Sequence, residues 1–206
     1  MATTHSLTTP TETDGPAVRL SGPLCLIGAV AAAGCFAVLG IGESGGTGAE
    51  VTAKLGDNAG RYQLASILAV FTAVPLAVAA ARLGRRIGGD AGRLATLAGV
   101  LVAVLMSAYF SAYAAGVAVA EFVLDEAGPG VGESTLVLLN LIELTRYAPG
   151  LLLVGAVLAA RSRLPRGITI PAWVLLVLTL VPMTTWLAAL IIPVWLGVAG
   201  ALAVRR

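Results

Sequence analysis

Long apolar runs recur along this chain and constrain its fold more than any other feature. Apolar residues make up 58% of the 206 positions and charged residues only 12%, which gives a mean hydropathy of +0.93. Soluble domains carry about 25% charged residues. The apolar residues gather in runs of about 20, the length of helix that crosses a bilayer. The pattern therefore predicts an all-α, polytopic transmembrane helix bundle.

The last apolar run decides the number of spans. Ile168–Val204 is apolar for 37 residues and lies between Arg166 and Arg205-Arg206. Basic flanks favour the cytoplasmic side, so the run is expected to cross twice, with a turn near Pro182–Trp186. One steeply tilted span is the alternative. The six expected spans cover residues 20–41, 61–81, 94–120, 136–160, 168–183 and 187–204.

The charges between the runs predict the orientation of the bundle. Six spans place ten basic residues on one side, including Arg82, Arg85, Arg86 and Arg93 in the loop after the second span, and Asp90 is the only acid of the loops on that side. The loops of the other side hold seven acids and two basic residues. Because positive loops stay in the cytoplasm, the N- and C-termini are expected there. Residues 1–18 are polar and rich in Thr and Pro, which predicts a disordered cytoplasmic tail before a membrane domain over residues 19–206.

The basic residues also suggest where the chain comes from. Lys54 is the only lysine among 13 basic residues, and Ala, Gly and Val are abundant, a bias typical of GC-rich bacterial genomes. The chain is therefore expected to be multi-pass in a bacterial plasma membrane. Its net charge of +2 is too small to indicate a nucleic-acid partner.

Two catalytic or cofactor motifs occur in the sequence, and neither has the context that its chemistry needs. Gly40–Gly45 matches a dinucleotide fingerprint, but it follows a predicted membrane helix rather than a strand. Gly42–Gly46 matches the serine hydrolase elbow, yet the only histidine is His5 in the tail. Cys25 and Cys35 lie ten residues apart, about 15 Å along one helix, too far for a disulfide. We expect no enzyme, no cofactor and no metal.

One run carries charges inside it. The span 136–160 contains Asn140, Glu143, Arg146 and Tyr147 in its first half. Asn140, Glu143 and Tyr147 fall within about 60° of one another on a helix, and Arg146 follows Glu143 by one turn. Two interpretations stay open. Either the charges face a protected cavity and contact a polar substrate, or the helix protrudes and Arg146 extends to the interface.

Hydroxyls and small residues recur at four-residue spacing on other spans. Ser107 and Ser111, and Tyr109 and Tyr113, form two such pairs on the span 94–120. Gly28 with Ala32, and the series Ala112, Gly116 and Ala120, repeat the spacing with small residues. This pattern favours close helix packing, with a homo-oligomer or another membrane protein as partner, and a stripe lining a substrate path is the alternative.

The stretch Leu152–Trp173 resembles an uncharacterised family of small six-span bacterial membrane proteins. The resemblance is carried by Ser162-Arg163-Leu164-Pro165-Arg166 and by Pro171-Ala172-Trp173, with a long loop containing Gly, Ala and Asn before the second span. It implies six helices and no mechanism. We therefore carry two hypotheses: a non-enzymatic protein of helix packing or envelope maintenance, and a small permease or export component that uses Glu143 and Arg146.

Overall fold

The structure is a computed structural model that describes residues 16–39, 47–119, 129–181 and 183–203. Its described residues are almost entirely helical, so the predicted all-α class is confirmed. The helices are α1 (Pro16–Leu39), α2 (Gly48–Asp57), α3 (Ala59–Ile87), α4 (Gly89–Ala118), α5 (Pro129–Ala159), the 3₁₀ turn η2 (Arg161–Arg163), α6 (Arg166–Leu180) and α7 (Thr185–Leu202).

Five of these helices are long and apolar enough to cross a membrane, namely α1, α3, α4, α5 and α7. The sixth apolar helix, α6, has only 15 residues and reaches about 22 Å at 1.5 Å per residue. That is shorter than the hydrocarbon core of about 30 Å. The chain is thus built as a multi-pass membrane protein.

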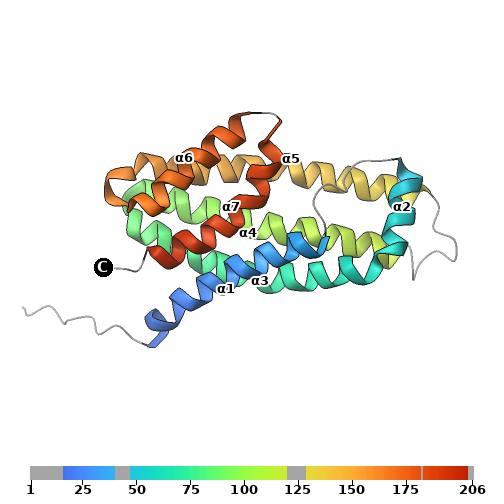
Figure 1. Cartoon of the computed structure of the whole chain (residues 1–206), viewed down its shortest axis with the longest axis horizontal. Helices are drawn as coiled ribbons and strands as arrows, with labels where there is room; N and C mark the ends of the chain where they lie inside the picture. The colour runs from blue at the N-terminus through green and yellow to red at the C-terminus, as the bar shows by residue number, and fades with distance from the viewer. Residues whose placement is uncertain (1–15, 40–46, 120–128, 182, 204–206) are drawn as a thin grey trace, which may run out of the picture.

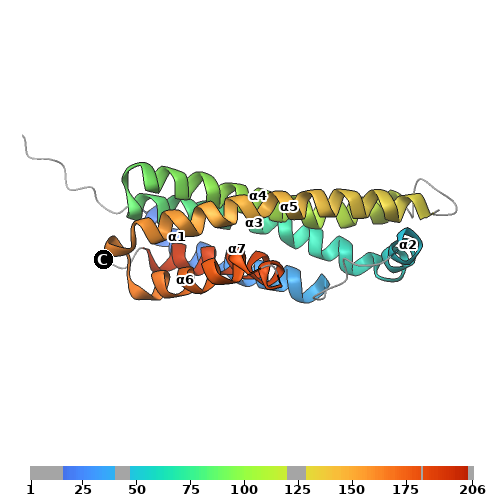
Figure 2. The same ribbon diagram turned by 90° about the horizontal axis from the view of Figure 1, so that it is seen from above.

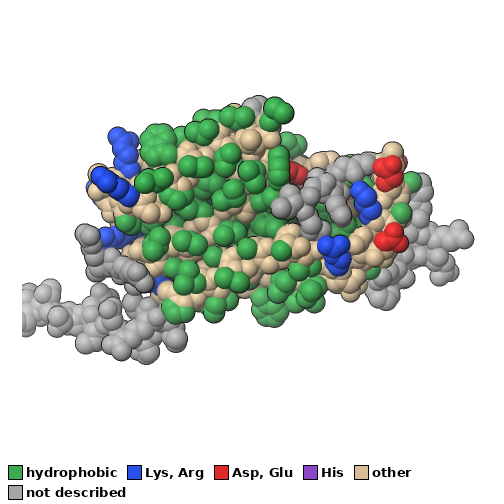
Figure 3. All heavy atoms as spheres, viewed as in Figure 1, with side chains coloured by type: hydrophobic (Ala, Val, Ile, Leu, Met, Phe, Trp, Pro, Cys, Tyr) green, Lys and Arg blue, Asp and Glu red, His purple; other side chains and the backbone are tan. Residues whose placement is uncertain are grey.

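The helices lie side by side and differ in length (Figure 1). Figure 2 shows α4 and α5 along one side of the bundle, α1, α6 and α7 along the other, and α3 between them. At one end, α3, α4 and α5 extend past the other spans and α2 crosses them. We call this the acidic end, after Glu50, Asp57 and Glu133. The opposite, basic end carries most of the arginines (Figure 3).

Helix α2 forms where the sequence analysis expects only a loop. Thr47 starts it with a capping box, because its hydroxyl accepts from the Glu50 backbone N–H and the Glu50 carboxylate accepts from the Thr47 N–H. The Gly132 N–H of α5 donates to Thr52 Oγ1 at 3.0 Å. Buried Leu55 completes the contact with the bundle. Thr47 and Glu50 carry the sequence signature of this helix start.

The 37-residue apolar run folds as two helices, as predicted. Helix α6 ends at Leu180 and α7 begins at Thr185, and Figure 1 shows them running back alongside each other. Threonine hydroxyls donate to carbonyl oxygens in the last turns of α6. Thr184 Oγ1 donates to the Leu178 carbonyl at 3.0 Å and Thr179 Oγ1 to the Leu175 carbonyl at 2.7 Å. The segment is therefore not one continuous helix, and of its two helices only α7 is long enough to count among the candidate spans.

Small residues bring the helices into backbone contact. A Cβ on Gly84 would lie 2.5 Å from the Gly92 carbonyl oxygen, and one on Gly200 would lie 2.6 Å from Ala79 Cα. The face predicted from Gly28 and Ala32 is packed as closely, since a Cβ on Gly28 would lie 2.8 Å from the Cβ of Pro75. These faces are therefore covered by the chain's own helices.

Both cysteines lie fully buried in α1. They are free, as expected because their spacing is too long for a disulfide. Several expectations fall outside the described residues: the tail 1–15, the glycine motifs at 40–46, Ala120 with the loop 121–128, and Arg205-Arg206. Helix α1 begins at Pro16, so the last residues expected in the tail belong to it.

Candidate functional site

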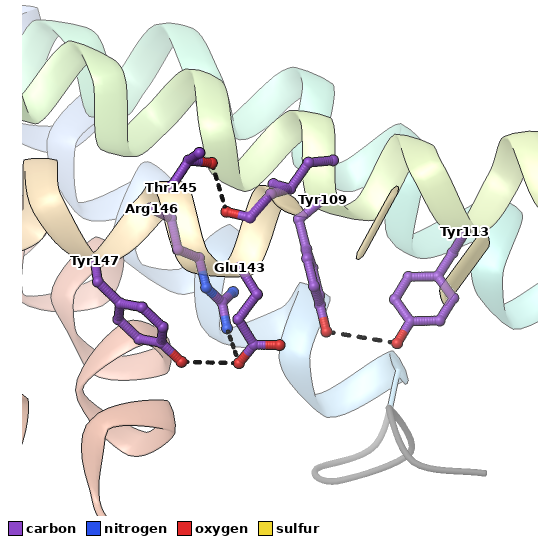
Figure 4. Close-up of polar contacts among 7 residues, drawn as sticks. Tyr109, Tyr113, Glu143, Thr145, Arg146 and Tyr147 are labelled. Carbon is purple, nitrogen blue, oxygen red and sulfur yellow. Dashed lines mark hydrogen bonds and ion pairs between the residues drawn. The ribbon is translucent and has the colours of Figure 1, made fainter. Parts of the chain in front are cut away.

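Glu143, Arg146 and Tyr147 lie on one face of α5 and form a connected cluster (Figure 4). Glu143 Oε1 accepts a hydrogen bond from Tyr147 OH at 2.9 Å and contacts Arg146 Nη2 at 3.3 Å. The i,i+3 and i,i+4 spacing of these residues on a helix produces the arrangement. One carboxylate oxygen thus holds both neighbours in place.

Helix α4 contributes an aromatic wall to this cluster. The guanidinium carbon of Arg146 lies 4.6 Å from the centroid of the Tyr109 ring, which is cation–π geometry. Tyr109 OH lies 3.5 Å from Tyr113 OH, and the Tyr113 ring stacks on Tyr62 of α3 at 4.9 Å. The polar residues of α5 are therefore held against an aromatic row that joins α4 to α3.

The cluster faces the inside of the bundle. Only 10% of the Arg146 side chain and 21% of the Glu143 side chain are exposed. The Nε of Arg146 is buried and has no hydrogen-bond partner among the described residues. The Arg146 side chain is therefore packed among the helices, and its Nε has no partner among the described residues.

Contacts between the helices give the depth of the cluster. Arg61 Nε, next to the stacked Tyr62, donates to the Val38 carbonyl at 3.1 Å, which marks the end of α1 on the acidic side. Tyr109 lies one turn, about 6 Å, below Tyr113. Arg146 lies 15 residues, about 22 Å, from Arg161 at the basic end. The cluster therefore lies near the middle of α5, and its two tyrosines lie in the half of α4 nearer the acidic end.

A small pocket adjoins Arg146 and Tyr147. The space is about 20 Å³, room for a single water. Its other walls are apolar and come from three helices: Phe36 of α1, Val102 and Met106 of α4, and Ala189, Ile192 and Pro193 of α7. Pockets for small molecules measure about 300–1,000 Å³. In this conformation the pocket therefore holds no substrate larger than water.

The remaining predicted site residues lie outside this cluster. Asn140 is exposed, one turn before Glu143. Ser107 Oγ donates to the Ala69 carbonyl of α3 at 2.8 Å, so this hydroxyl joins two helices. Ser111 is partly buried on the same helix. The structure thus brings together Glu143, Arg146, Tyr147 and the two tyrosines of α4.

Arg82 is a buried charge that the sequence analysis assigns to a loop. It lies within α3, 4% exposed, and its Nη1 donates to the Ser21 hydroxyl of α1. Its Nη2 is buried without a partner among the described atoms. The sequence signal for this burial is the position of Arg82, which directly follows Ala79-Ala80-Ala81 at the end of an apolar run. Among the described residues, no three His, Cys, Asp or Glu side chains form a metal-binding group.

Fold and cluster together define a multi-pass membrane protein with a buried polar cluster. Searches with the whole chain found no matching protein family, no matching curated protein and no matching solved structure. The function proposed for this chain therefore rests on the geometry and the chemistry of its own residues.

Proposed function

We propose that this chain is a non-enzymatic integral membrane protein whose role depends on helix packing within the envelope. The observation that supports this most is the size of the pocket beside Arg146, about 20 Å³, inside a bundle closed by backbone contacts between small residues. Such a cluster orients α5 against α4 and leaves no room beside Arg146 for a solute larger than water. Glu143, Arg146 and Tyr109 are then structural residues.

The proposal includes six spans with both termini in the cytoplasm of a bacterium. The clustering of Arg85, Arg86, Arg161, Arg163 and Arg166 at one end of the bundle supports this orientation. Because α6 is short, the bilayer would thin or the helix flanks would adapt around it. Kinship with the small six-span family that the stretch Leu152–Trp173 resembles remains part of this proposal.

Association with other membrane proteins would use faces that the chain's own helices leave free. The small residues Gly28 and Gly116 are already in contact with α3 and α5. Large apolar side chains are exposed instead along α3 and α5, including Phe71 at 74% and Leu144 at 71%. These faces contact lipid, and they are the surfaces through which a second copy or another membrane protein would bind.

A small permease or export component is the second candidate, because one observation favours it. The Nε of Arg146, which lines the small pocket, is a buried donor without a partner among the described residues, and leaving such a donor unsatisfied costs about 1–3 kcal/mol. A substrate with a carboxylate or carbonyl oxygen would satisfy it. This candidate requires a second conformation in which the pocket is larger.

Charge-neutralising variants separate the two candidates. Glu143→Gln and Arg146→Gln are purified, reconstituted into vesicles and compared for thermal unfolding and for leakage of small anions and amino acids. The packing role predicts a lower unfolding midpoint and no change in solute flux. Flux that is present in the wild type and lost in a normally folded Arg146→Gln variant would overturn the packing role and support the permease.

Cysteine labelling tests the depth of the cluster in the same proteins. Single cysteines at 143, 146 and 147 are introduced after Cys25 and Cys35 are replaced by Ser, with exposed Glu133 at the acidic end of α5 as the control position. Packing predicts rapid labelling of position 133 by a membrane-impermeant maleimide and slow labelling of the other three. Rapid labelling confined to 143 and 147 would indicate a water-filled path to the cluster.

A further inference from the structure

The basic end holds a second and much larger pocket. It measures about 320 Å³ and lies between the last turn of α3, the η2 turn and the end of α7. Arginines supply its polar wall (Arg86, Arg163 and Arg166), together with Ser162, and none of its lining residues is acidic. This volume lies within the range of small-molecule pockets, unlike the space beside Arg146.

One of the three arginines of this pocket is fixed by a hydrogen bond to another element. Arg163 Nη1 donates to the Ile87 carbonyl at 3.0 Å, which binds η2 to the end of α3. Arg86 is half-buried in the last turn of α3, and Arg166 is exposed at the first turn of α6. Three arginines from three elements therefore line one space. Guanidinium groups suit phosphate oxygens because they donate two parallel hydrogen bonds.

An apolar surface continues from the pocket along α6. Leu164 and Leu202 form the apolar part of its wall. Beyond Arg166, the same face of α6 exposes Ile170, Trp173, Val174 and Val177, at positions i+4, i+7, i+8 and i+11. A molecule with a phosphate group at the pocket would thus have apolar surface for its chains along the span. A free anion would leave that surface unused.

We propose that this pocket binds the phosphate head group of an anionic phospholipid, with the acyl chains along the exposed face of α6. The arginines neutralise the phosphate, and Ser162 is placed to donate to it. The bound lipid would cover the short helix α6, which does not span the hydrocarbon core by itself. The pocket is separate from the Glu143–Arg146 cluster and does not depend on the role proposed for that cluster.

The test measures lipid binding to the full chain in detergent. Dioleoyl phosphatidylglycerol and dioleoyl phosphatidylcholine, which share acyl chains, are titrated against the thermal unfolding midpoint and against retained lipid in native mass spectrometry. The double variant Arg86→Gln/Arg166→Gln removes two pocket charges. The control, Arg85→Gln/Arg93→Gln, removes the same charge from exposed positions outside the pocket.

We expect the wild type to bind phosphatidylglycerol more tightly than phosphatidylcholine. The pocket variant should weaken phosphatidylglycerol binding by about fivefold for each arginine removed, since a basic residue near an anionic surface contributes about 1 kcal/mol. The control variant should change it by less than about twofold. If the pocket variant does not fold, Arg166→Gln against Arg85→Gln gives the same comparison with single charges.

Three results would overturn the proposal. Equal losses in the pocket and control variants would mean that a diffuse basic surface attracts the lipid. No loss in either variant would mean that the pocket does not bind it. A midpoint shift by inorganic phosphate as large as that by phosphatidylglycerol would mean that the pocket takes a soluble anion.

Discussion

Arg146 of α5 lies with its guanidinium carbon 4.6 Å from the centre of the Tyr109 ring of α4, while the same group contacts Glu143 at 3.3 Å. The aromatic face and the carboxylate thus share one buried cation. In a medium that lacks water, both contacts are stronger than at a protein surface. The pair joins two helices at the level where α1 and the α6–α7 hairpin approach their ends.

Replacing Tyr109 should measure this contact. Tyr109→Leu removes the ring, and we expect the free energy of unfolding to fall by about 1–2 kcal/mol through the lost cation–π interaction. Tyr109→Phe keeps the ring and loses only the 3.5 Å approach to the Tyr113 hydroxyl, so it should cost clearly less. Denaturation in detergent, monitored by far-UV circular dichroism, checks the difference. Equal losses in both variants would show that the ring face does not matter.

The ion pair should show strong coupling in a double-mutant cycle. Arg146→Met leaves the Glu143 carboxylate without its cation, and we expect a loss of about 3 kcal/mol. Adding Glu143→Gln removes that charge and keeps an acceptor for Tyr147, so part of the stability should return. A coupling energy of about 0.5–3 kcal/mol in unfolding measurements is expected. Additive effects of the two changes would contradict a buried pair.

Backbone contact between α3 and α4 should be intolerant of a single methyl group. In Gly92→Ala, the new Cβ would lie 2.3 Å from the Gly84 carbonyl oxygen, so the helices must move apart. We expect a loss of about 1–3 kcal/mol. Gly155→Ala in α5 is the control, because its Cβ meets nothing within 4 Å, and it should be neutral or stabilising. Comparable midpoints for the two variants would argue against the close approach.

Helix α2 should depend on its capping box. Thr47→Ala removes the acceptor for the Glu50 N–H and should destabilise the helix locally by about 1 kcal/mol. Thr47→Ser retains the hydroxyl and serves as the control. Hydrogen–deuterium exchange should then increase over residues 48–57 in the alanine variant only, with the long helices unchanged. Unchanged exchange in α2 would mean that Thr52 and Leu55 hold the helix without the cap.

Much of the fold could be read from local patterns, and the exceptions have identifiable causes. The helical class and the turn between Leu180 and Thr185 follow from apolar length and flanking charge. Helix α2 was not predicted because glycines and charges are typical of loops, although the spacing of Thr47 and Glu50 is that of a capping box at a helix start. Arg82 was assigned to a loop because it begins a run of arginines, whereas it is buried and its hydrogen-bond partner Ser21 lies 61 positions earlier.

The candidate site was likewise predictable from the sequence only in part. Helical periodicity put Glu143, Arg146 and Tyr147 on one side of α5, and the structure connects them through one carboxylate oxygen. Asn140 satisfies the same periodicity yet is exposed, because only the packing of α4 and α7 decides where the covered face ends. The pairing of Arg146 with Tyr109 joins residues from two spans, and no local pattern contains it.

By itself, the sequence determined that this chain is a multi-pass helical membrane protein, since the free energy of moving a long apolar run out of water depends on composition and length alone. It also determined which short-range pairs share a helix face. Tertiary structure alone decided that Arg146 lies inside the bundle, that Arg82 is buried, and that Arg86, Arg163 and Arg166 enclose one pocket. These outcomes depend on how separate helices pack, and packing is set by contacts between residues that are distant in the chain.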